Sequence, residues 1–73
     1  MPDRDEKRYK LVKLSGGEVL STQYLPTFRE VEKEVRKAKK EDPTFIIRND
    51  IDIYDNRSNK EWMVDLDWQL VEM

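Results

Sequence analysis

The sequence predicts a small α+β domain of the order ββαββ, in which one helix packs on a four-stranded sheet. Two segments of alternating apolar and polar residues flank Gly16-Gly17, a helical pattern runs between Pro26 and Pro43, and two further alternating segments flank the polar stretch 55–59. Repeats of two residues indicate strands, and repeats of about 3.6 residues indicate a helix. A chain of 73 residues has room for one domain.

The first seven residues differ in composition from the rest of the chain. Residues 1–7 are almost all charged and show no apolar periodicity. Segments of this kind cannot bury enough apolar surface to offset the entropy of ordering. We therefore predict a flexible charged arm at residues 1–7 and a single folded domain at residues 8–73.

The segments RYKLVKL and VLSTQYL, which flank SGGE, predict the first hairpin. Glycine accepts the positive φ angles that a two-residue hairpin turn requires. Such a turn at Gly16-Gly17 places Leu14 opposite Val19 and Tyr9 opposite Tyr24. Both faces of this hairpin carry apolar residues, so the pattern alone does not choose the buried one. One face offers Tyr9, Leu11, Leu20 and Tyr24, and the other offers Val12, Leu14, Val19 and Leu25.

Charge favours one orientation of the first hairpin. If the first strand lies beside the last, turning Tyr9 and Leu11 inward turns Lys10 outward, within reach of Asp65 or Asp67. We adopt this orientation, which leaves Val12, Leu14 and Val19 as an apolar surface patch.

Thr27 and Glu30 mark the start of the predicted helix. A Thr side chain followed three residues later by Glu forms a capping box, in which both side chains satisfy backbone N–H groups. Pro43 prevents the helix from continuing. One face of this predicted helix carries an apolar stripe suited to packing across a sheet, made of Phe28, Val31, Val35 and Ala38.

The second hairpin, TFIIRNDIDIY and KEWMVDLDWQLVEM, separates by parity into two faces. The expected core face holds Phe45, Ile47, Ile51, Ile53, Trp62, Val64, Leu66, Trp68 and Leu70. The opposite face holds Ile46, Arg48, Asp50, Asp52 and Tyr54 on one strand and Met63, Asp65, Asp67, Gln69 and Val71 on the other. Four aspartates therefore share one side of neighbouring strands, where like charges repel each other. From Phe45 onward there are seven acidic and three basic residues, so this half of the chain is the acidic one.

The ββαββ order resembles that of β-grasp domains. The resemblance covers nearly the whole chain but rests on architecture only. It implies a helix over a mixed four-stranded sheet, with the first and last strands side by side. It implies no activity, because that fold hosts many unrelated tasks.

The residue types present argue against an enzyme, a cofactor or a metal centre. The chain has no cysteine and no histidine, so Ser15, Ser21 and Ser58 have no imidazole base to activate them. SGGE lacks the lysine and helix of a phosphate-binding loop. The four aspartates are hard oxygen ligands, but DIDIYDNRSNKE lacks the glycine at the sixth position of an EF-hand loop. We expect no metal site and no cofactor.

The lengths of the apolar runs argue against a membrane-spanning segment, and the charge pattern of the helix argues against nucleic-acid binding. The longest apolar runs are only a few residues, and the N-terminus MPDRDEKR is not signal-like. These features favour a cytoplasmic protein. On the helix, Lys and Arg residues alternate with Glu, so most of the field that would attract phosphate is cancelled.

The class of function that remains is protein–protein interaction. We expect a small adaptor or inhibitor, a monomer or weak homodimer, that binds a larger protein with a basic surface. Carboxylates would steer association and apolar neighbours would supply affinity. The expected contact residues are Asp50, Asp52, Asp65, Asp67, Val12, Leu14, Met63 and Val71.

In size, charge density and lack of a catalytic constellation, the chain resembles small bacteriophage proteins that bind host machines such as RNA polymerase. This resemblance is one of class and implies a role in host interaction and transcription regulation. Alternative interpretations are mimicry of nucleic acid by the carboxylates, nucleic-acid binding through the Lys/Arg-rich helix, and a designed or structural domain with no partner.

Overall fold

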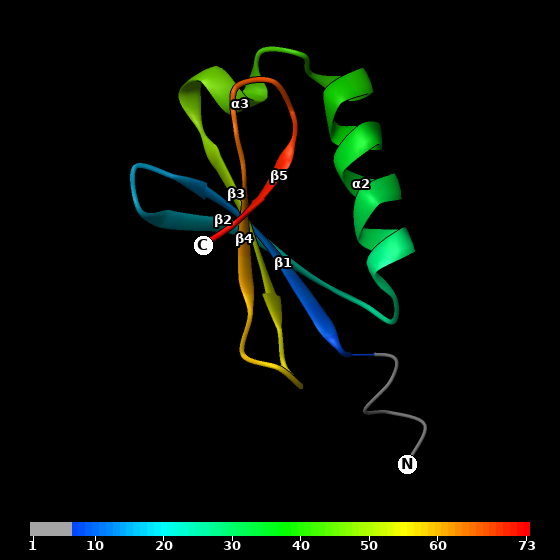
Figure 1. Cartoon of the computed structure of the whole chain (residues 1–73). Coiled ribbons are helices and arrows are strands. Elements are labelled where there is room, and N and C mark those ends of the chain that lie inside the picture. Colours follow the sequence, from blue (N-terminus) through cyan, green and yellow to red (C-terminus); the bar gives the residue numbers. More distant parts are fainter. Residues whose placement is uncertain (1–6) are drawn as a thin grey trace.

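The computed structural model describes residues 7–73 and packs helices against one face of a five-stranded antiparallel sheet (Figure 1). The elements in chain order are β1 (Tyr9–Ser15), β2 (Glu18–Leu25), α2 (Phe28–Glu41), α3 (Phe45–Arg48), β3 (Asp50–Asp55), β4 (Glu61–Val64) and β5 (Leu70–Glu72). The strand order is β2-β1-β3-β4-β5, so β2 and β5 form the two edges. None of the described helices is long and apolar enough to cross a membrane.

The α+β class is confirmed, whereas the strand count and the strand neighbours differ from the prediction. The sheet has five strands rather than four, and every pairing in it is antiparallel. β1 lies between β2 and β3, and two strands separate it from the last one. The β-grasp arrangement, with its mixed sheet and adjacent terminal strands, is therefore not the one adopted. The connection through α2 and α3 returns the chain antiparallel to β1, so the rest of the sheet is an antiparallel meander.

The first hairpin forms where the sequence predicts it, but with a shifted register. Gly16 and Gly17 have φ angles of 58° and 84°, the left-handed values of a tight hairpin turn. Leu14 pairs with Val19 as expected, and a bulge then leaves Leu20 without a partner. Because one extra residue inverts the parity of a strand, Leu25 rather than Tyr24 reaches the core opposite Tyr9.

Helix α2 confirms the predicted boundaries. The Thr27 hydroxyl accepts a hydrogen bond of 3.2 Å from the backbone N–H of Glu30, and Asp42 caps the other end, just before Pro43. The predicted stripe faces the sheet, with Val31, Val35 and Ala38 buried. Its first residue, Phe28, is half-buried with its ring centroid 5.0 Å from that of Trp62.

The predicted strand from Thr44 begins instead with one helical turn, α3. The Asp42 side chain accepts hydrogen bonds from the backbone N–H and the hydroxyl of Thr44, which bends the chain immediately before α3. Helical geometry buries Ile46 and leaves Ile47 70% exposed, the reverse of the alternation expected for a strand. Four consecutive residues FIIR carry too little periodicity to separate the two structures.

The core lies between the sheet and the helices. It is built from Tyr9, Leu11, Leu25, Val31, Val35, Ala38, Ile46, Ile51, Ile53 and Val64. Residues 1–6 of the predicted arm lie outside the described residues. The carbonyl of Lys7 accepts a hydrogen bond of 2.7 Å from the Asn56 side chain.

Candidate functional site

The face of the sheet opposite α2 has no covering layer among the described residues. Within residues 7–73, both helices lie on the core side of the sheet (Figure 1). We call this second side the open face. Cross-strand pairing and parity assign to it Lys10, Val12, Leu14, Val19, Thr22, Tyr24, Asp50, Asp52, Tyr54, Glu61, Met63 and Val71.

An apolar row crosses the centre of the open face. Val12 on β1 pairs with Thr22 on β2 and Asp52 on β3, Asp52 pairs with Met63, and Met63 pairs with Val71 on the edge strand. Val12 is buried by its neighbours in the sheet, whereas Met63 and Val71 are 39% and 43% exposed. The exposed apolar part of this row is therefore Met63 with Val71, beside Asp52, and this adjoining pair on an uncovered sheet face is the candidate contact surface.

Three carboxylates gather beside this apolar row. Burial raises the pKa of Asp52, and the charges of Asp50 and Glu61 raise it further, although a hydrogen bond with Tyr54 opposes them. Burial and the same neighbours, Asp52 and Glu61, also raise the pKa of Tyr54. The field at this point of the open face is therefore negative, and an added cation would relieve it.

Lys10 lies next to this cluster. Its Nζ lies 5.9 Å from the centre of the Tyr54 ring, in a cation–π arrangement. Lys10, Val12, Leu14 and Tyr54 help to line an open hollow of about 410 Å³. The expected pairing of Lys10 with Asp65 or Asp67 does not occur, because β3 and β4 separate β1 from the β4–β5 turn.

The structure brings six of the eight predicted contact residues onto one face and places the other two elsewhere. Asp50, Asp52, Val12, Leu14, Met63 and Val71 all belong to the open face. Asp65 and Asp67 lie in the turn between β4 and β5. The continuous stripe of four aspartates that strand parity predicts is therefore not formed.

Asp65 leaves the stripe because its carboxylate organises the turn. Its Oδ1 accepts hydrogen bonds of 2.9 Å from the backbone N–H groups of Asp67 and Gln69. Trp68 takes a positive φ of 63° there, which is uncommon for any residue other than glycine. The strand alternation stops at this point, so Leu66 is 71% exposed instead of buried.

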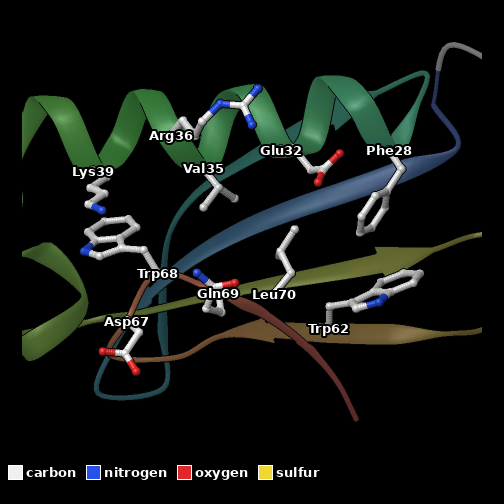
Figure 2. Close-up of a pocket in the computed structure, with 10 residues that line it drawn as sticks. All are labelled: Phe28, Glu32, Val35, Arg36, Lys39, Trp62, Asp67, Trp68, Gln69 and Leu70. Carbon is white, nitrogen blue, oxygen red and sulfur yellow. The ribbon is translucent and has the colours of Figure 1, made fainter.

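Asp67 lines a groove on the opposite side of the sheet, between α2 and the β4–β5 hairpin (Figure 2). The groove has a volume of about 500 Å³. Phe28, Trp62 and Leu70 form its apolar wall at one end, and Trp68 lies beneath Lys39 at the other (Figure 2). Trp62 and Trp68 are thus on the core side, as parity predicts, but each remains partly exposed.

The solvent side of α2 mixes charges of both signs. A surface hollow there is lined by Glu30, Lys33, Glu34, Arg36, Lys37 and Lys40. Because carboxylates interrupt the cations, this helix presents no continuous basic track along its described surface of the kind that nucleic-acid backbones require.

Asp55, for which we had no expectation, is 4% exposed and is the one buried charged residue in residues 7–73. Arg8 donates two hydrogen bonds of 3.3 Å to its carboxylate, Ser58 donates one of 2.7 Å, and the backbone N–H of Arg57 donates one of 2.9 Å. Burial would raise the pKa of Asp55, but these bonds and the Arg8 charge outweigh it and hold the pKa below its ordinary value. A signal was present, because an Asp side chain favours a turn by accepting from the backbone N–H two residues on, as Asp55 does from Arg57.

Among residues 7–73, no group of three or more potential ligand side chains is arranged to hold a metal ion. The buried carboxylate that could have been a catalytic acid is fully occupied by the turn. The open face itself offers aliphatic contact area beside a cluster of negative charges.

Comparisons with protein-family models, with curated proteins and with solved structures found no match to this chain.

Proposed function

We propose that the chain is a non-enzymatic protein-interaction module that docks through its open face onto a basic surface of a larger protein. The observation that carries the proposal is that exposed Met63 and Val71 lie beside Asp52, whose pKa is raised by burial and, to a lesser extent, by the charges of Asp50 and Glu61. Apolar groups supply affinity at such interfaces, and charges supply steering and register.

The carboxylates explain why the partner is basic. Asp50 and Glu61 both repel Asp52 in the free protein, and a Lys or Arg from a partner would remove that cost on binding. Among large partners we favour machines that handle nucleic acid, RNA polymerase included, because their working surfaces are basic. The role would be that of an adaptor or inhibitor.

The test is affinity capture with matched charge reversals. The tagged parent chain is compared with Asp50→Lys on the open face and with Asp67→Lys in the β4–β5 turn, which changes the net charge equally. Thermal unfolding first establishes that both variants fold. We expect a partner that the parent and Asp67→Lys retain, that Asp50→Lys loses, and that salt releases.

Two outcomes would contradict the proposal. One is a partner lost by Asp67→Lys but kept by Asp50→Lys, which would assign docking to the groove of Figure 2. The other is a salt-insensitive partner that both variants retain. If the parent chain captures labelled nucleic acid and Lys33→Glu on α2 abolishes that capture, the result would favour nucleic-acid binding through α2 instead.

A further inference from the structure

Edge strand β2 differs in composition from the rest of the surface. The chain is 41% charged, yet residues 19–28 form a run of ten residues without a charge, the longest in the sequence. Seven of those residues belong to β2, and every β2 residue except Leu25 is exposed. Natural edge strands usually carry Lys, Pro or inward charges that prevent pairing with another chain. Along β2 only Glu18, at its start, has a charge.

Within residues 7–73, the outward backbone groups of β2 at Thr22 and Tyr24 have no strand partner. The backbone N–H of Asn56, just beyond β3, donates to the carbonyl of Arg8, so the even-numbered residues of β1 turn their backbone groups toward β3. The odd-numbered residues turn toward β2, and Leu11 therefore forms a hydrogen-bonded pair with Gln23. The N–H and C=O groups of Thr22 and Tyr24 consequently point away from the sheet.

From this geometry we propose that two copies of the chain pair antiparallel through residues 21–25 of β2 and form one continuous sheet. A two-fold axis at Gln23 places Thr22 of each copy opposite Tyr24 of the other. Both pairs can then exchange two backbone hydrogen bonds, because these are the groups that point outward. The axis runs perpendicular to the sheet, so the two open faces join side by side and the two α2 helices lie on the other face.

The chemistry of this register favours a second copy as the occupant. The facing side chains are Thr with Tyr, a β-branched and aromatic pair that stabilises sheets, and Gln23 with its own counterpart. No charge faces another charge, and the net charge of each copy is only −2. The bulge at Leu20 bends the first part of β2 away, which confines pairing to residues 21–25. The other edge, β5, is three residues long and carries Glu72.

Self-association does not require the proposed docking partner, but it would raise the avidity with which the chain binds that partner. A dimer presents two copies of the open face on one surface, and a partner with two sites would bind both with an affinity gain that needs no new contacts. Loss of the dimer would lower avidity and leave the contacts of each open face intact.

The test is sedimentation of the purified full chain over a range of concentrations up to millimolar. We expect the parent to shift from monomer to dimer, and Thr22→Pro to remain monomeric, because proline removes an N–H that points outward and leaves the bonds to β1 unchanged. Thr22→Val keeps the N–H and the β-branched shape, so it should dimerise as the parent does.

A charge exchange at the two-fold axis tests the register and does not depend on whether Thr22→Pro folds. Gln23→Glu and Gln23→Lys each place like charges opposite one another, so each variant alone should stay monomeric. An equimolar mixture of the two should recover the dimer. A parent that is monomeric at every concentration would overturn the proposal, as would single variants that dimerise as tightly as the parent, or a mixture that stays monomeric.

Discussion

Asp55 is the residue around which the β3–β4 turn is built. Its two oxygens accept hydrogen bonds from Arg8, Ser58 and the backbone of Arg57, so a single carboxylate joins the start of β1 to the turn. A buried charge is tolerated when such partners compensate for lost hydration, and removal of one side leaves the others unsatisfied.

Asp55→Ala should lower the free energy of unfolding by about 3 kcal/mol at pH 7, the lower end for breaking a buried ion pair, because Arg8 is partly exposed. The pKa of Asp55 is lowered on folding, so its contribution is complete above the unfolded pKa of about 3.9 and declines as the pH falls below that value. Urea unfolding between pH 7 and pH 2 measures both effects. Asp50→Ala, on the same strand but exposed, is the control, and an equal loss in the two variants would contradict this role.

Asp52 should behave in the opposite way, since its pKa is raised on folding. Its ionised form destabilises the folded chain at neutral pH, and protonation relieves that cost as the pH falls through the raised pKa. Asp52→Asn keeps an oxygen for the Tyr54 hydrogen bond and should stabilise the fold at pH 7 by about 0.2–1 kcal/mol for each like-charge neighbour removed. The gain should shrink at high salt and at low pH. A destabilised Asp52→Asn would show that the carboxylate is a structural acceptor.

At the scale of elements, α2 attaches to the sheet through an aromatic cluster at its first turn. The ring of Phe28 lies edge-on to Tyr9, with centroids 5.7 Å apart, and 5.0 Å from the ring of Trp62. These contacts join α2 to β1 and β4, so the cluster also fixes one end of the groove in Figure 2.

Phe28→Ala should lower the free energy of unfolding by about 2–3 kcal/mol, somewhat less than the 3–5 kcal/mol typical of a fully buried ring, because Phe28 is half-buried. Thermal and urea unfolding measure the change. Arg29→Ala, the next residue on the exposed side, should alter stability by no more than about 0.5 kcal/mol. An unchanged melting curve for Phe28→Ala would mean that α2 packs in another register.

The sequence predicts an element well where residues close to its ends determine where it begins or stops. Thr27 with Glu30, Pro43 and the glycine pair each act within a few residues of the structure they determine. The bulge at Leu20 had no such signal, because strand pairing imposes it. The positive φ of Trp68 arises in a turn that the Asp65 carboxylate organises, inside a stretch whose alternation reads as a continuous strand. α3 was missed because a run of four mainly apolar residues fits a strand as well as a helix.

At the scale of the whole molecule, the departures from the predicted strands change which residues share the predicted contact surface. Strand parity predicted the faces of β3 and β4, so Asp50, Asp52 and Met63 lie on the open face. Val12 and Leu14 also lie there, although the pairing of Lys10 with Asp65 or Asp67 that favoured this orientation of β1 does not occur. Strand parity failed at Asp65, where a side chain bonded to two backbone N–H groups ends the strand. The acidic surface is therefore smaller than predicted, and it is centred on β3 beside aliphatic residues.

The central claim, that the open face is the docking surface, is tested most directly by hydroxyl-radical footprinting of the captured complex against the free chain. Met63 reports the open face and Trp68 reports the groove on the other side, and both side chains oxidise readily and are partly exposed. We expect oxidation of Met63 to slow several-fold in the complex while that of Trp68 is unchanged. Equal oxidation of Met63 in the free and bound chain, with Trp68 protected instead, would contradict the account.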